Sequence, residues 1–144
     1  MLKDSDIGGR RHATVYTSAI AMGASDTQPL LCPDRAIVIE SLGFIPDAAM
    51  TGHGTHTKIV AVQNRGSSGS GTTEVAPADT FGASDDLVAF DLRAFTLSTT
   101  AANLILTADQ VLAMVVTEAN NGIAWPAGQW RIGYRYYEQG AVAS

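Results

Sequence analysis

The residues best suited to chemistry in this 144-residue chain include three histidines. His53 and His56 stand three positions apart, a spacing that lets two imidazoles face one metal ion from a turn. A structural zinc site takes four ligands, so the others would have to be His12 or distant carboxylates. A polar loop is therefore the favoured interpretation, and we predict no metal and no cofactor.

The aspartates and the cysteine have similarly simple interpretations. Asp85 and Asp86, with Asp79 nearby, could bind calcium or act as acid and base, but no calcium-loop spacing accompanies them. Because adjacent side chains on a strand point to opposite faces, a solvated strand entrance is favoured. Cys32 precedes Pro33 and has no basic cluster nearby in sequence, which predicts a small buried thiol rather than a reactive one.

No nucleophile or phosphate loop is recognisable. The glycine- and serine-rich stretch 66–73 lacks the lysine and the following helix that a phosphate loop needs. The Gly-x-Ser-x-Gly motif of a strained nucleophile turn is absent. We therefore predict no catalytic residues and expect that the protein is not an enzyme.

Composition and charge exclude other classes of function. Charged residues make up only 16% of the chain, and the net charge is −5. An acidic chain repels phosphate backbones, and its basic residues are scattered, so we expect no nucleic-acid partner. Residues 1–11 lack the apolar region of a secretory signal, and no apolar run is long enough for a membrane span. We expect synthesis in the cytoplasm and no membrane partner.

The elements that position these residues are predicted to be strands, because hydrophobic residues alternate with a period of two. The clearest stretch is 129–137, where one face carries Trp130, Ile132, Tyr134 and Tyr136. Similar patterns predict strands over 13–22, 34–44, 57–63, 87–96, 102–106 and 110–117, with a weaker one over 72–75. In the stretch 87–96, Val88, Phe90, Leu92 and Ala94 are expected to share a face.

This pattern predicts an all-β fold, an antiparallel β-sandwich that is jelly-roll-like and has about eight strands. We divide the chain into an N-terminal arm, residues 1–12, and a single sandwich domain, residues 13–144. Among the aromatic residues near the end, Trp125, in a turn beside Pro126, and Tyr137 are the two expected to be exposed. Exposed aromatics stack on sugar rings, so a carbohydrate-binding module is an alternative.

Several segments resemble structural proteins of tailed bacteriophages. The similarity covers roughly residues 36–136 and consists of turn and strand signatures. Its parts are Ile39–Gly52, which contains Phe44-Ile45-Pro46-Asp47-Ala48-Ala49, and Lys58–Gly66, Leu87–Phe90, Leu104–Leu112 and Pro126–Ile132. The family often has Gly-Asp where this chain has Ala108-Asp109.

The resemblance implies a virion structural protein, made in the host cytoplasm and placed on the capsid exterior. The specific expectation is a decoration (cement) protein, a homotrimer that binds the major capsid protein and bridges neighbouring subunits. Lys3, Arg10 and Arg11 in the arm would meet an acidic shell surface. The alternative is a head-fibre or tail module that binds a carbohydrate or a receptor.

Overall fold

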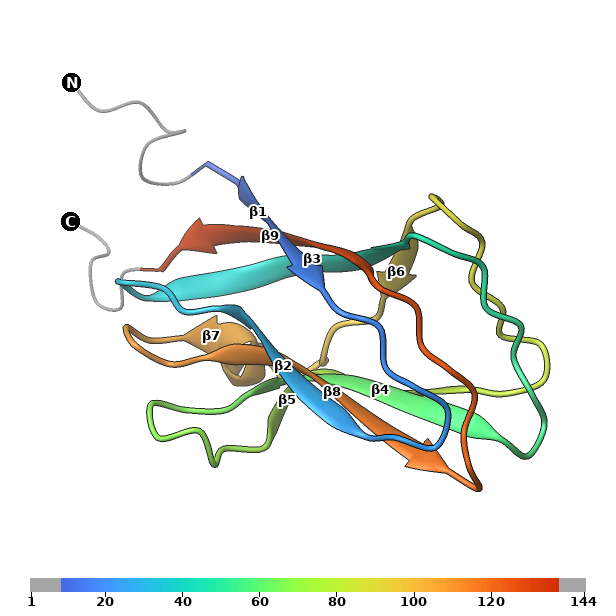
Figure 1. The fold of residues 1–144 in the computed structure, drawn as a ribbon. Coiled ribbons are helices and arrows are strands. Elements are labelled where there is room, and N and C mark those ends of the chain that lie inside the picture. The colour runs from blue at the N-terminus through green and yellow to red at the C-terminus, as the bar shows by residue number, and fades with distance from the viewer. Residues whose placement is uncertain (1–8, 138–144) are drawn as a thin grey trace, which may run out of the picture.

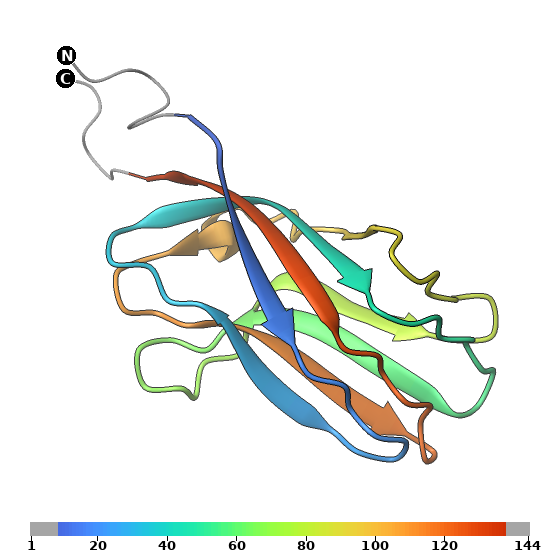
Figure 2. The same cartoon turned by 45° about the horizontal axis from the view of Figure 1, so that its top comes forward.

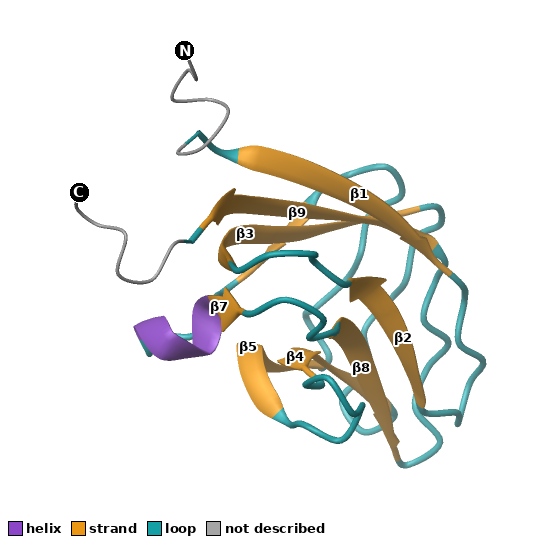
Figure 3. Ribbon diagram, turned by 90° about the vertical axis from the view of Figure 1, so that its left-hand side faces the viewer, coloured by secondary structure: helices purple, strands orange, loops and turns teal. Residues whose placement is uncertain are grey.

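A computed structural model describes residues 9–137 of the chain and shows two antiparallel sheets packed face to face (Figures 1 and 3). One sheet has the order β1 (Arg11–Thr17), β9 (Gly128–Tyr136), β3 (Ile37–Pro46) and β6 (Arg93–Phe95), with β7 (Ile105–Leu106) also paired to β3. The other has the order β2 (Asp26–Leu31), β8 (Leu112–Ala119), β4 (Thr57–Asn64) and β5 (Thr73–Phe81). The predicted antiparallel sandwich is confirmed.

Most predicted strands are present with shifted ends. β1 begins at Arg11 and ends at Thr17, whereas its predicted range was 13–22. A single turn of 3-10 helix, η1 (Ala101–Leu104), replaces most of the predicted strand 102–106. β2 was not predicted, because Asp26–Leu31 contains a proline and little alternation. No helix among residues 9–137 is long and apolar enough to cross a membrane.

The predicted strand 87–96 is wrong over most of its length. Only its last part forms β6, and Leu87 makes a single bridge to Met50. Between them the chain turns: the amide of Asp91 donates to the carbonyl of Val88 at 3.1 Å, and Phe90 has a φ of +63°. An alternation of apolar and polar residues in a turn exposes its apolar members instead of burying them on one sheet face.

The core between the sheets is built around five aromatic rings. Each neighbouring pair of their centroids lies 5.0–6.2 Å apart, in stacked, tilted or edge-on arrangements. The rings belong to Phe44, Phe81, Phe95, Trp125 and Trp130. The indole of Trp130, on one sheet, donates to the sulfur of Met114, on the other, at 3.2 Å. The period-two alternation of β9 therefore marks its core face correctly at Trp130 and Ile132.

The burial of two residues, Cys32 and Lys58, differs from what their types suggest. Cys32 is exposed, so the predicted buried thiol is wrong, and it is the adjacent Pro33 that is buried. Lys58, the residue before the apolar stretch of β4, is fully buried. Its ammonium group donates to the carbonyls of Ala21 and Ala24, which ties the β1–β2 connection to β4. A buried cation is tolerated here because carbonyl oxygens replace part of its hydration.

Stability should rise with pH in the alkaline range because of Lys58. Burial lowers the pKa of its ammonium group below 10.5, and the nearby carboxylate of Glu118 opposes this in part. Between the two pKa values the unfolded chain binds more protons than the folded one, so the free energy of unfolding increases with pH. Urea unfolding from pH 7 to 10.5 measures this for the wild type and for Lys58→Met. The free energy of unfolding of the wild type, relative to that of the variant, should increase with pH. Parallel curves would contradict this interpretation.

Candidate functional site

Arginines gather at the end of the five-stranded sheet where β1 begins and β9 ends. The register pairs Arg11 of β1 with Tyr134 of β9, and Ile37 of β3 with Tyr136 of β9. The three strands lie side by side at this end (Figure 2). Residues that are far apart in sequence are thereby brought together at one corner of the molecule.

A β-bulge in β3 positions the acidic residue of this corner. The pairing of β3 with β9 shifts at Glu40, which has no direct partner between Ile39 and Ser41. The shift also changes which side chains face the core: Ile39 is buried before it, and Leu42 and Phe44 are buried after it. A bulge re-aims a side chain in this way, and Glu40 is thereby turned to the outside of the sheet.

Glu40 holds two arginines. One carboxylate oxygen lies 2.9 Å from Nε of Arg10, and the other lies 2.7 Å from Nε of Arg135. Both arginines are about half exposed, at 51% and 45% of their side chains. Ion pairs of this exposure contribute little to stability. Their main consequence is that two guanidinium groups are held in defined places at the surface.

Two further arginines stack on one aromatic ring. The guanidinium carbons of Arg11 and Arg35 lie 4.9 Å and 4.2 Å from the ring centroid of Tyr136. We call Arg10, Arg11, Arg35 and Arg135, with Glu40 and Tyr136, the arginine corner. It contains four of the nine Lys and Arg residues of a chain whose net charge is −5. The positive charge of the molecule is thus concentrated at one end.

The residues predicted as contacts have different outcomes. Arg10 and Arg11 both belong to the arginine corner. Lys3 lies outside the described residues. Tyr137 lies beside the corner and is half-buried rather than exposed. Its amide donates to the carbonyl of Ala36 at 2.9 Å.

Three members of the corner were missed from the sequence: Arg35, Glu40 and Arg135. The only available signal was the alternation of β9, which places Arg135 on the outward face. Nothing local indicates that Glu40 lies at a bulge or that Arg35 reaches the ring of Tyr136. Their grouping depends on strand pairing across about a hundred residues.

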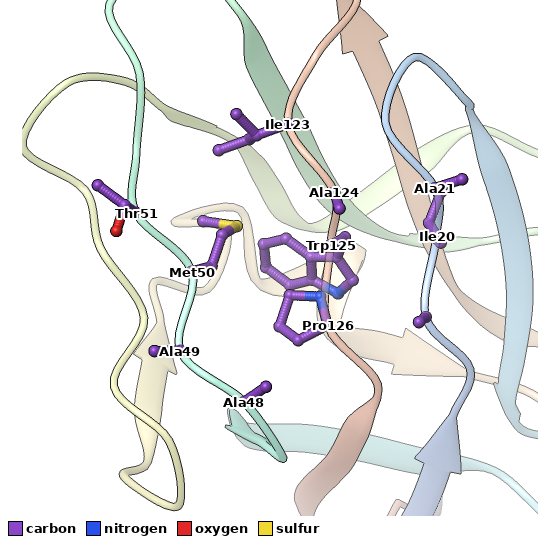
Figure 4. Close-up of a pocket in the computed structure, with 11 residues that line it drawn as sticks. Ile20, Ala21, Ala48, Ala49, Met50, Thr51, Ile123, Ala124, Trp125 and Pro126 are labelled. Carbon is purple, nitrogen blue, oxygen red and sulfur yellow. The ribbon is translucent and has the colours of Figure 1, made fainter.

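Trp125 is fully buried, so its predicted exposure is wrong. It forms a two-way backbone bridge with Ile20 and packs between the rings of Phe44 and Phe81. Above it lies an open apolar cavity of about 590 Å³, whose walls are the segments 19–21, 48–51 and 123–126 (Figure 4). The turn-like sequence around Pro126 gave no sign that two loops flank the indole.

The histidines and aspartates do not form a metal site among residues 9–137. His53 and His56 have ring centroids 4.6 Å apart, but Nδ1 of His53 accepts hydrogen bonds from the amides of Thr55 and His56 and so shapes the loop. His12 lies on β1 of the five-stranded sheet, whereas this loop precedes β4 of the other sheet. These contacts agree with the favoured interpretation of a polar loop.

The aspartates likewise have separate partners. Asp79 pairs with Arg93 at 2.8 Å, and Asp86 accepts from the amide of Gly52 at 2.8 Å. Asp85 accepts from the amide of Gly82 at 3.3 Å. Each carboxylate therefore contacts a different segment, and that of Asp86 joins the β5–β6 connection to the β3–β4 connection.

No protein-family model matches the chain, and no curated protein matches it in sequence. Among solved structures, the chain is similar to a protein chain in the structure of the Gx strain of infectious bursal disease virus. The TM-score is 0.45 and the identity is 14%, and the match covers 88% of this chain and 32% of the viral chain. It is also similar to the VP2 subviral particle of the same virus, with a TM-score of 0.42 and 13% identity over 91% and 34%. The chain spans about a third of the length of these matched chains.

Proposed function

We propose that the chain is a virion structural protein, specifically a decoration protein that binds the outside of a capsid and bridges neighbouring shell subunits. The resemblance of segments within residues 36–136 to tailed-bacteriophage structural proteins motivates the class. The observation that carries the docking role is the arginine corner, which concentrates positive charge at one end of an acidic molecule.

The physical mechanism is electrostatic docking followed by repeated burial of surface. A positive patch on an acidic protein selects and orients a negatively charged partner, and guanidinium groups pair with carboxylates in a fixed geometry. A shell offers the same acidic surface many times, so a modest contact per copy gives a stable coat when each copy touches more than one subunit. Assembly as a homotrimer would give each trimer three arginine corners.

The carbohydrate-binding alternative loses its strongest candidate residue. Stacking on a sugar requires an exposed aromatic face, and Trp125 is fully buried, with its ring stacked on Phe44 and in edge contact with Phe81. We therefore favour protein docking over sugar binding for this chain.

The copy number of the chain in purified virus particles tests the proposal. Quantitative mass spectrometry should give a ratio to the major shell protein near one, as expected for a protein that coats the lattice. A ratio of a few per cent would instead assign the chain to a fibre, vertex or tail. Its absence from particles would overturn the virion role.

The arm has a separate test. Residues 1–8 precede the described part of the chain, and β1 begins shortly after them, at Arg11. A variant that lacks residues 1–8 should keep its unfolding midpoint and bind shells more weakly, because a polar arm can order on a partner. Unchanged shell binding would remove the arm from the proposal without affecting the arginine corner.

A further inference from the structure

A second basic feature lies on the outer face of the five-stranded sheet, next to the arginine corner. It is a groove of about 240 Å³ that crosses β1, β9, β3 and the residues around β6. Its basic wall is formed by Arg10, His12 and Arg131, and Leu92 and Ala94 form an apolar wall. We call this feature the mixed groove.

Two glycines in the central strands let the side chains around the groove pack close to the sheet. Gly133 of β9 is paired with His12 on one side and Ser41 on the other, and Gly43 of β3 is paired with Arg131. A Cβ atom on Gly133 would lie 2.2 Å from Oγ of Ser41, which is closer than atoms can approach. Glycine in a strand interior costs stability, and here it permits a close approach of neighbouring side chains.

The basic wall has binding capacity that the molecule does not use. Arg131 has no ion pair with a carboxylate of residues 9–137, and its side chain is exposed. Arg10 is held at the rim of the groove by Glu40. A guanidinium group has five donors, so both arginines can accept a further anion.

The apolar wall continues into an exposed apolar segment. Leu92 is 47% exposed, and in the same turn Val88 and Phe90 are 62% and 78% exposed. Phe90 has a φ of +63°, an uncommon conformation for a bulky residue, and its amide donates to the carbonyl of Pro46 at 2.8 Å. Exposed aromatic and aliphatic side chains beside an arginine without a carboxylate partner are typical of protein interfaces.

We propose that the mixed groove binds a protein segment that presents an aspartate or glutamate side chain next to an apolar residue. The carboxylate pairs with Arg131 and Arg10, and the apolar residue packs on Leu92. A carboxylate, that of Glu40, already pairs with Arg10, so this guanidinium is placed for contacts of this kind. The net charge of −5 opposes a multiply charged polyphosphate more strongly than a segment that presents a single carboxylate. The inference rests on the proposed function only for the identity of the partner.

The test uses the whole chain and two capped peptides, acetyl-Gly-Leu-Asp-Leu-Asp-Gly-amide and the same peptide with asparagine in place of aspartate. In amide-resolved NMR titrations, the aspartate peptide should shift the signals of Gly43, Arg131 and Gly133. The asparagine peptide should bind at least about tenfold more weakly, since about 1.4 kcal/mol of charge pairing corresponds to that factor. Equal binding of the two peptides would overturn the carboxylate assignment.

Variants separate the two walls of the groove. Arg131→Gln should weaken binding of the aspartate peptide about tenfold, and Leu92→Ser should weaken binding of both peptides. Arg65→Gln, which follows β4 of the four-stranded sheet, should change the binding of neither. Thermal unfolding confirms that each variant is folded. An Arg131→Gln variant that is folded and binds normally would overturn the proposal, as would tighter binding of inorganic phosphate than of the aspartate peptide. Because this experiment uses no virus particles, its outcome is independent of the copy-number measurement.

Discussion

Replacing Trp125 by alanine should lower the free energy of unfolding by about 3–5 kcal/mol, the range measured for large aromatic residues in protein cores. The indole is fully buried and its centroid lies 5.2 Å from Phe44 and 5.0 Å from Phe81, so truncation leaves a large void between the sheets. Urea unfolding monitored by circular dichroism measures the change. A loss below about 1 kcal/mol would mean that Trp125 is not part of the core.

A matched pair of phenylalanine variants separates packing from hydrogen bonding. The indole nitrogen of Trp125 is buried and has no hydrogen-bond partner among residues 9–137, whereas that of Trp130 donates to Met114. Trp125→Phe therefore removes an unpaired buried donor, whereas Trp130→Phe removes a hydrogen bond. We expect the first variant to be the less destabilised of the two, because an unpaired buried donor is itself costly. The reverse order would show that the two indoles differ mainly in packing.

The arginine corner should dominate binding to the shell. In the double variant Arg10→Gln/Arg135→Gln, we expect the dissociation constant for purified shells lacking the chain to rise about 5- to 30-fold. Each exposed ion pair contributes up to about 1 kcal/mol, and two are lost. Co-sedimentation of the chain with such shells at fixed ionic strength measures the constant. The unfolding midpoint should change little, because both side chains are about half exposed.

Salt and a neutral control make this prediction specific. Binding of the wild type should weaken as ionic strength rises, and the double variant should show a smaller dependence on salt. Arg65→Gln removes one positive charge from the connection after β4 and should leave shell binding unchanged. If Arg65→Gln weakened binding as much as the double variant, net charge and not the arginine corner would be responsible.

Local alternation was a reliable guide where a strand has one buried and one exposed face. β9 is such a strand, and its core residues Trp130 and Ile132 were identified correctly. β4 and β8 are apolar on both faces and were also predicted. A short apolar run that is rich in β-branched residues and has turn residues at each end is typical of a buried strand. The same reasoning failed at 87–96, where the alternating residues belong to a turn.

Sequence patterns by themselves determined that this chain forms an antiparallel β-sandwich, and they identified Arg10 and Arg11 as basic residues near its beginning. Only the tertiary structure decided that Arg35, Glu40 and Arg135 join them, that Trp125 is buried, and that Arg131 and Leu92 line one groove. The physical reason is the range of the interactions. Strand formation follows from the spacing of neighbouring side chains, whereas these features depend on the register between strands that are far apart in the chain.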